Sequence, residues 1–412
     1  MTVRGHGCRS CGASIEHVVL DLGEQPLANA YPDPGRLDDP EPHYPLQVGI
    51  CTECWLVQLT HDVDPTVVFD AEYAYFSSVS ESWLAHADAY AATTVEALAL
   101  DTGSLVVEVA SNDGYLLRSF VSRGVPVLGI EPSANVAAVA ETNGVPTRVE
   151  FFGRACAEAL RAEGVRPDLV VGNNVLAHVP DLDDFVGGLA TLVAESGLLT
   201  MEFPHLLSLL EHREFDTIYH EHYSYFSLLA ACDVFGRRGM DIVDVELLTT
   251  HGGSLRIHVR AEGASERSSR VDALLERERS SGLDDLDAYR TFAADVAQVR
   301  ADLMAFLQEA RDGGRTVVAY GAPAKGNTLL NYCRVTSELV PFTVDRSPVK
   351  QGRVLPGTHL PIEAPERLVD ARPDYVLVLP WNIVDEIAAQ MAVVRDWGGR
   401  FVVPIPRVRV LD

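Results

Sequence analysis

The segment that most constrains the fold lies between residues 105 and 131. Residues 105–109 form a continuous apolar run, a small-residue turn follows at 110–114, and residues 115–123 have helical spacing. A second apolar run at 126–130 ends in Glu131. This order of strand, turn, helix, strand and acid predicts the nucleotide-cofactor half of a doubly wound α/β sheet, with the acid placed to accept hydrogen bonds from ribose hydroxyls.

The turn indicates which cofactor binds there. A dinucleotide pyrophosphate favours G-x-G-x-x-G, but this turn has only Gly114 and places Asp113 where phosphates would lie. NAD is therefore disfavoured, whereas S-adenosylmethionine, which is cationic and has no phosphate, suits an acidic turn. Residues 108–114 are similar to the acid-x-G-x-G-x-G motif of the common methyltransferase sheet, with Ala110 and Asn112 replacing the first two glycines.

Two further apolar segments, at residues 168–178 and 198–205, are typical of the next strands of such a sheet. Asn173 and Asn174 would lie at the cofactor-facing end of the first of them. The candidate cofactor contacts are Glu108, Ala110, Ser111, Asn112, Gly114, Glu131, Pro132, Asn173 and Asn174.

A pair of CxxC motifs near the N-terminus predicts a metal site. Its candidate ligands are Cys8, Cys11, Cys51 and Cys54. Two such knuckles can point four thiolates at one zinc ion, although the Pro-rich gap between them is long for a compact ribbon. Four sulfur ligands leave no open position for water, so a structural zinc is favoured over a catalytic one. The alternative, four unrelated buried cysteines, leaves the matched spacing unexplained.

Length and charge exclude several classes of protein. A chain of 412 residues predicts two or three domains. With 59 acidic and 33 basic residues, the formal net charge of −26 disfavours binding to nucleic acid or to anionic lipid. No apolar run is long enough to span a membrane or to act as a signal peptide, and the three remaining cysteines are scattered. We expect a cytoplasmic protein. No motif sets its oligomeric state.

Residues 218–226 have an unusual density of groups that donate, accept or move protons. The stretch reads IYHEHYSYF, and each polar group in it would need a partner if buried. His222 is the candidate general base, because histidine ionises near neutral pH. Alternatives remain: His220 and His222 could bind a metal, any single tyrosine could be a packed core residue, and His178 and His205 fit structural roles better than catalytic ones.

Taken together, the motifs resemble those of the sugar C-methyltransferases of deoxysugar biosynthesis, over nearly the whole chain. The motifs that carry the resemblance are the CxxC pair, VEVASNDG, GIEPS, NNVLAHV, EFPH with YHEHYSYFS, and a YGAPAKGN turn in the C-terminal part of the chain. The resemblance implies an α/β enzyme with a small N-terminal zinc-binding lobe (1–68), a central Rossmann-like S-adenosylmethionine domain (69–265), a helical linker (266–312) and a second Rossmann-like domain (313–412).

The same resemblance implies methylation of a nucleotide-linked 4-keto-6-deoxysugar, expected to be dTDP-linked, at C-3, with C-5 as the chief variant. An enzyme must first remove the proton next to the ketone and stabilise the enolate. The resemblance places this base on His222, with Glu221 or a neighbouring tyrosine to orient it and Tyr219 as a partner for the sugar or enolate. Tyr73 and Tyr75 form a second pair of aromatic donors, and Tyr75 is also a candidate sugar contact.

The C-terminal segment supplies the remaining candidate sugar-nucleotide contacts, which are Lys325, Trp381 and Asn382. An ancient cofactor domain that serves only as a scaffold is the alternative for this segment. Two alternatives to C-methylation also stay open. One is methylation of oxygen or nitrogen on a small molecule, and the other is a non-catalytic zinc-bearing binding protein with a degenerate cofactor fold.

Overall fold

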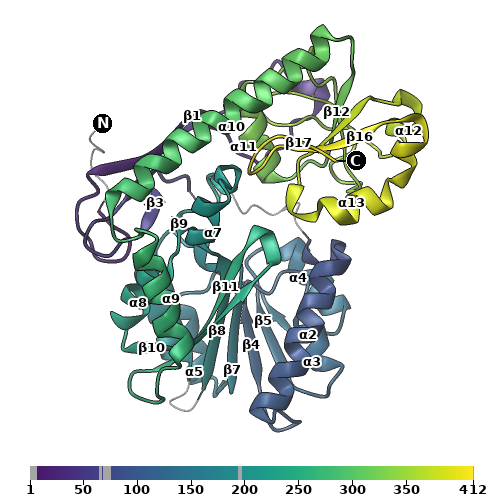
Figure 1. Cartoon of the computed structure of the whole chain (residues 1–412). Coiled ribbons are helices and arrows are strands. Elements are labelled where there is room, and N and C mark those ends of the chain that lie inside the picture. Colours follow the sequence, from purple (N-terminus) through teal and green to yellow (C-terminus); the bar gives the residue numbers. More distant parts are fainter. Residues whose placement is uncertain (1–6, 65–66, 68–75, 194–196, 412) are drawn as a thin grey trace.

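The computed structural model describes residues 7–64, 67, 76–193 and 197–411, and three β-sheets organise the chain (Figure 1). The N-terminal sheet is antiparallel and has the order β1-β2-β3-β9. Its strands are β1 (His17–Pro26), β2 (His43–Ile50), β3 (Val57–Leu59) and β9 (Ser224–Tyr225). The last strand therefore comes from the proton-handling stretch in the middle of the chain.

The central sheet has seven strands in the order β10-β11-β8-β7-β4-β5-β6. Five neighbouring strands, β8 to β6 in this order, are parallel, and β11 and β10 continue the sheet as an antiparallel pair. The strands are β4 (Val106–Val109), β5 (Val127–Ile130), β6 (Thr147–Arg148), β7 (Leu169–Asn173), β8 (Leu198–Pro204), β10 (Met240–Leu248) and β11 (Ser254–Ala261).

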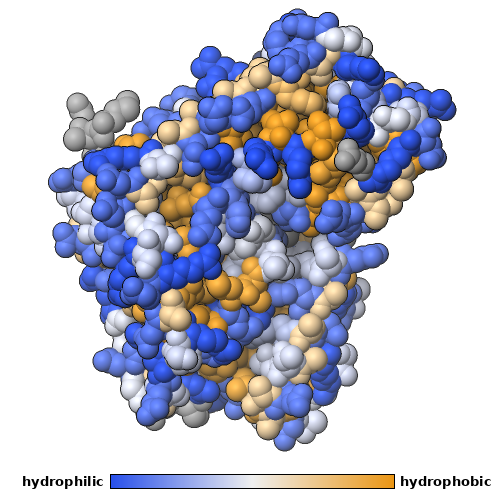
Figure 2. All heavy atoms as spheres, viewed as in Figure 1, coloured by the Kyte–Doolittle hydropathy of each residue, from blue (hydrophilic) through white to orange (hydrophobic). Residues whose placement is uncertain are grey.

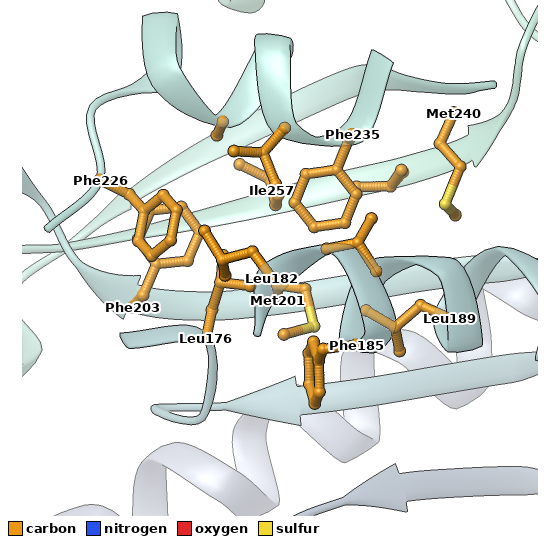
Figure 3. Packing of buried hydrophobic residues seen from close by; sticks show 14 of the residues in the cluster. Leu176, Leu182, Phe185, Leu189, Met201, Phe203, Phe226, Phe235, Met240 and Ile257 are labelled. Atoms are coloured by element: carbon orange, nitrogen blue, oxygen red, sulfur yellow. The ribbon is translucent and has the colours of Figure 1, made fainter. Parts of the chain in front are cut away.

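Helices cover both faces of the central sheet. Successive residues of a strand point to opposite faces, so neighbouring residues pack against different helices. Val106 packs with α2 (Glu81–Leu98), α3 (Leu117–Val121) and α4 (Ala134–Thr142). Val107 belongs to the core on the other face. Figure 3 shows part of that core. That core is covered by α5 (Arg154–Ala162), α6 (Leu182–Leu192), α8 (Leu228–Gly236) and α9 (Ser269–Ser280).

Phe226 ties the end of the proton-handling stretch into this core. Its ring lies 5.4 Å from that of Phe203 on β8, and both are buried (Figure 3). The neighbouring Tyr225 pairs with Val57 of β3 in the N-terminal sheet. Adjacent residues are thus anchored in two different units, which restricts the position of the whole stretch.

The C-terminal sheet has the order β14-β13-β12-β15-β16-β17 and is parallel except for β17. Its strands are β12 (Val317–Tyr320), β13 (Thr343–Val344), β14 (Ile362–Glu363), β15 (Tyr375–Val378), β16 (Arg400–Val403) and β17 (Arg409–Val410). Its helices are α11 (Ala324–Cys333), α12 (Arg367–Ala371) and α13 (Val384–Gln390).

The two helices of the expected linker pack on different units. Helix α9 contributes Val271 and Leu274 to the core of the central sheet. Helix α10 (Leu286–Asp312) instead shares a core with the N-terminal and C-terminal sheets and runs across both of them (Figure 1). Helix α7 (Leu206–Glu211) also belongs to this second core.

Short 3-10 helices complete the chain. They are η1 (Pro34–Arg36), η2 (Ser77–Val79), η3 (Leu176–His178), η4 (Phe215–Thr217), η5 (Thr250–Gly252), η6 (Trp381–Ile383) and η7 (Ala392–Trp397). Along the chain, the strands of the N-terminal sheet end at Leu59 apart from β9, those of the central sheet lie between Val106 and Ala261, and those of the C-terminal sheet lie between Val317 and Val410.

Polar residues cover most of the face seen in Figure 2, and hydrophobic residues gather over its upper part. Within the described residues, no helix has the length and apolar character needed to cross a membrane. The expected α/β architecture, with an N-terminal lobe and two Rossmann-like sheets, is confirmed.

Candidate active site

The turn after β4 adopts the backbone conformation that the glycine-rich motif requires. Ala110, Asn112 and Gly114 have φ angles of 57°, 49° and 76°. These left-handed values favour glycine, are tolerated by asparagine and cost alanine free energy. The two substituted positions of the motif thus keep the shape of the turn without keeping its glycines.

Three acidic side chains line this turn. Glu131 accepts hydrogen bonds from the backbone N–H groups of Asn112 (3.0 Å) and Ser133 (2.9 Å). Burial raises the pKa of Glu131, and it raises the pKa of Glu108 well above its ordinary value, with Asp113 adding to both shifts. A cationic ligand would relieve this concentration of buried acid.

Buried polar atoms gather at the same edge of the sheet. Ser111 Oγ, Asp113 Oδ1, Ser133 Oγ and Asn174 Oδ1 make no hydrogen bond within the described parts of the chain. Asn173 is buried at the end of β7, and Pro132 follows Glu131 at the end of β5. Acidic groups together with unpaired hydrogen-bonding atoms fit S-adenosylmethionine, which carries positive charge and many polar groups.

The four N-terminal cysteines converge, and their ligand atoms lie within 4.8 Å of one another. Cys8 Sγ is 3.4 Å from Cys54 Sγ, and Cys11 Sγ is 3.5 Å from Cys51 Sγ. Each knuckle closes with a backbone hydrogen bond of 2.8 Å, from Gly12 N to the Cys8 carbonyl and from Trp55 N to the Cys51 carbonyl. The set fits a tetrahedral zinc ion with all four positions filled by sulfur.

His222 is held by both ring nitrogens. Its Nδ1–H donates to the Thr217 carbonyl at 2.7 Å, because a carbonyl only accepts. In the neutral ring Nε2 is then the basic atom, and it accepts from the Tyr219 hydroxyl at 2.9 Å. The 3-10 helix η4 and the turn after it thereby fix the tautomer that a general base needs.

The surroundings keep this imidazole uncharged. Burial lowers the pKa of His222 well below its ordinary value, and the nearby His178, whose ring centroid lies 4.7 Å away, lowers it further. His178 itself has its pKa lowered to about 4 by burial. A structural role was expected for His178 and this contact was not predicted; the one signal in the sequence was that His178 follows the strand that became β7, and in the structure it lies in η3.

Glu221 does not orient His222. Its carboxylate accepts from Asn29 Nδ2 at 2.5 Å in the N-terminal lobe, and burial raises its pKa to about 7. Of the two kinds of orienting group expected from the sequence, tyrosine contacts the imidazole: Tyr219 through its hydroxyl, and Tyr225 with its ring edge-on at 6.2 Å between centroids. Residues 219–222 form a turn, closed by a hydrogen bond of 2.9 Å from the His222 N–H to the Tyr219 carbonyl, and within this turn the Glu221 side chain faces the N-terminal lobe.

The three candidate contacts from the C-terminal unit lie together. Lys325 Nζ donates to Asn382 Oδ1 at 2.8 Å and lies 4.5 Å from the centre of the Trp381 ring. The Trp381 indole donates to Asp216 Oδ2 at 2.7 Å. Burial lowers the pKa of Lys325 and raises those of Asp216 to about 6 and Glu214 to about 8. Lys325 also adds to the lowering of the pKa of His222, so this cluster and the base interact.

Two further histidines considered from the sequence, His220 and His205, have separate surroundings. His220 faces the N-terminal lobe, with Nε2 3.3 Å from the Tyr44 carbonyl, and among the described residues it belongs to no metal-ligand cluster. His205 is buried against Glu278 at 2.7 Å, in agreement with its structural interpretation. Tyr73 and Tyr75 lie outside the described residues.

Comparison with known proteins identifies the family. A C-methyltransferase C-terminal domain family matches residues 249–406, a zinc binding domain family matches 8–69, and a methyltransferase domain family matches 83–245. C-methyltransferase NovU from Streptomyces niveus is 38% identical over 409 residues, which make up 98% of this chain and 96% of NovU. The chain belongs to the NovU family of C-methyltransferases.

This member of the NovU family is thus an S-adenosylmethionine-dependent C-methyltransferase with a four-cysteine zinc site. A ubiquinone biosynthesis O-methyltransferase from Rhodopseudomonas palustris is 29% identical over 100 residues, 24% of this chain and 39% of that protein. Magnesium protoporphyrin IX methyltransferase from Synechocystis matches 43% of this chain and 79% of its own, with 18% identity and a TM-score of 0.33. These two shorter matches add nothing to the assignment. The expected enzyme class and cofactor are confirmed, in preference to a non-catalytic binding protein.

Proposed function

We propose that this C-methyltransferase methylates C-3 of a nucleotide-linked 4-keto-6-deoxysugar, with dTDP as the nucleotide. The observation that carries the proposal is the His222 imidazole, which is buried and neutral and has its basic Nε2 fixed by the bond from Nδ1 to the Thr217 carbonyl. A methyl acceptor that is already nucleophilic needs no such base. A carbon next to a ketone does, because it must lose a proton before it can attack a methyl sulfonium.

The proposed reaction begins when the sugar displaces the Tyr219 hydroxyl from His222 Nε2. This nitrogen then takes the proton from C-3, and the electron pair of the C–H bond moves into the ring to give an enolate whose negative charge lies on the C-4 oxygen. The freed Tyr219 hydroxyl, 2.9 Å from Nε2 before substrate enters, donates to a sugar oxygen. S-adenosylmethionine supplies the electrophilic methyl group when bound at the turn after β4.

In this scheme, the negative charge of the substrate raises the pKa of the base, His222. Lys325 lowers the pKa of His222 through its positive charge, and Lys325, Trp381 and Asn382 are the proposed contacts of the nucleotide diphosphate. An anionic diphosphate beside Lys325 would offset that field and raise the pKa of His222. The proton affinity of the base would therefore increase when substrate is bound.

Deuterium exchange tests the proposal directly. The enzyme is incubated in D₂O with a dTDP-linked 4-keto-6-deoxyhexose without methyl donor, and NMR follows each ring proton. We expect loss of the C-3 proton and, after addition of S-adenosylmethionine, a new methyl group on C-3. Exchange and methylation at C-5 would move the assignment to that carbon, and the absence of both would refute the proposed function.

A further inference from the structure

The turn between β10 and β11 holds a histidine in a strained backbone conformation. His251 has φ 56° and ψ 18°, in the left-handed region, and Gly252 and Gly253 follow it with φ angles of 100° and 141°. A histidine in this region costs about 1–3 kcal/mol. The turn is anchored on both sides, because Thr250 Oγ1 donates to Glu202 Oε1 at 2.8 Å and Ser254 Oγ donates to the Thr250 carbonyl at 3.0 Å.

The contacts of the His251 ring fix its tautomer. Nε2 lies 3.1 Å from the amide nitrogen Nδ2 of Asn174, which can only donate, so Nε2 accepts and Nδ1 carries the proton. Trp83 packs against the ring, with centroids 4.9 Å apart. Within the described residues, the Nδ1–H group has no hydrogen-bond acceptor. The side chain therefore offers one directed donor.

This donor lies where the parts of the active site meet. Asn174 belongs to the cofactor edge of the central sheet, and the 3-10 helix η5 lies against η6, which carries Trp381 and Asn382. Charge on His251 would disfavour charge on His222, so the two rings interact electrostatically. Burial lowers the pKa of His251 to about 4, with Lys325 adding to the shift, and the ring stays neutral near pH 7.

We propose that His251 is a further catalytic residue, whose Nδ1–H donates to the ketone oxygen as that oxygen becomes the enolate. This inference rests on the proposed function. The C-3 proton moves to His222 Nε2, the C–H pair forms the C-3 to C-4 double bond, and the carbonyl pair moves onto the oxygen facing His251. When C-3 bonds to the methyl group the carbonyl re-forms, and the pair of the broken carbon–sulfur bond stays on sulfur. A neutral imidazole suits this role because it donates without holding a proton that the enolate would capture.

Two substitutions separate this role from a merely structural one. In His251→Asn the amide nitrogen takes the place of Nδ1, and asparagine tolerates the left-handed backbone. In His251→Gln the amide group takes the place of Nε2 and can keep the contact with Asn174, but the Nδ1 donor is lost. A structural role through Asn174 thus favours the glutamine variant, whereas an oxyanion donor favours the asparagine variant.

The readout is the rate of C-3 deuterium exchange in a dTDP-linked 4-keto-6-deoxyhexose without methyl donor, together with calorimetry of S-adenosylhomocysteine binding. We expect His251→Asn to stay within about tenfold of wild type and His251→Gln to lose about 100-fold or more, as for removal of one oxyanion donor. His251→Gly, which suits the backbone and lacks the ring, should show the same loss. His258→Gln, on β11 beside Glu246, is the matched control and should exchange like wild type.

The outcomes distinguish the two levels of the proposal. Wild-type exchange combined with undiminished exchange in the glutamine and glycine variants would overturn the role of His251 and leave the proposed function intact. Absence of exchange in wild type would overturn both. If the glutamine variant were faster than the asparagine variant, the contact with Asn174 would be the function of this ring.

Discussion

Replacing Glu221 by glutamine should stabilise the protein at high pH. Glu221 is 5% exposed as a residue, and burial raises the pKa of its carboxyl from the ordinary 4.5 to about 7. A carboxyl whose pKa is raised by folding favours the folded state while it is protonated, and this stability is lost as the pH rises from the unfolded pKa to the folded one. At 1.36 kcal/mol per pH unit, ionising Glu221 costs about 3 kcal/mol at pH 9 and less than about 1 kcal/mol at pH 5.

Glutamine cannot ionise, and its side-chain oxygen can still accept from Asn29. The free energy of unfolding of Glu221→Gln relative to wild type should therefore rise by about 2–3 kcal/mol between pH 5 and pH 9. Urea or thermal unfolding at the two pH values measures this change, and any constant cost of the new amide cancels in the comparison. Glu158→Gln, on the exposed side of α5, is the control and should show no such rise. A difference that is flat with pH would mean that Glu221 is not held as an uncharged acid.

Three other changes test the site and its supports. His222→Asn keeps a donor for the Thr217 carbonyl but lacks the base, so we expect C-3 exchange and methyl transfer to fall about 10²–10⁴-fold, with S-adenosylhomocysteine affinity by calorimetry nearly unchanged; retained turnover would place the base elsewhere. Cys51→Ala should abolish stoichiometric zinc binding, measured by elemental analysis. It should also speed amide hydrogen exchange in residues 219–226, because β9 pairs with β3 beside the second CxxC motif; unchanged exchange rates would show that zinc does not stabilise residues 219–226. Ala110→Gly should change the free energy of unfolding by less than about 0.5 kcal/mol, because removing the strain of alanine at φ 57° offsets the larger conformational entropy that glycine loses on folding. The control Ala138→Gly in α4 should lower the free energy of unfolding by about 1 kcal/mol, and equal losses in the two variants would show that the turn at Ala110 is not strained.

The local patterns of the chain predicted the parts of the fold that depend on nearby residues. The apolar runs became β4, β5, β7 and β8, and the matched cysteine spacing became one four-sulfur cluster. Ala110 and Asn112 were identified as glycine replacements, and their positive φ angles show that the turn keeps the conformation for which the motif uses glycine. In each case the pattern is local, whether it is the burial of one strand, the geometry of one turn or the spacing of the two cysteines within each CxxC motif.

Features that depend on long-range packing were not predictable in this way. The pairing of β9 with β3 joins residues 57 and 225, and no pattern in either segment specifies the other. The orientation of Glu221 toward Asn29, and of Lys325 toward Asn382, likewise follows from how the three units pack together. His251 precedes two glycines in a turn that carries no recognisable motif, and its contact with Asn174 places its ring beside the cofactor edge of the central sheet.

Among the residues that the structure describes, no carboxylate is bonded to a ring nitrogen of His222, and this bears on how the proposed base works. A carboxylate on Nδ1 would raise the pKa of the imidazole permanently, whereas the Thr217 carbonyl fixes the tautomer at little electrostatic gain. Burial, then the neighbouring His178 and His251, and to a smaller extent Lys325 lower the pKa of His222, which leaves a base that is neutral at physiological pH but weak. If the proposed function holds, the diphosphate of the substrate supplies negative charge near His222. The pKa of His222 would then rise only in the complex with the sugar, where the C-3 proton is present. Free enzyme would thus expose no strong base to water, and the same charge that selects a nucleotide sugar would also activate the residue that acts on it.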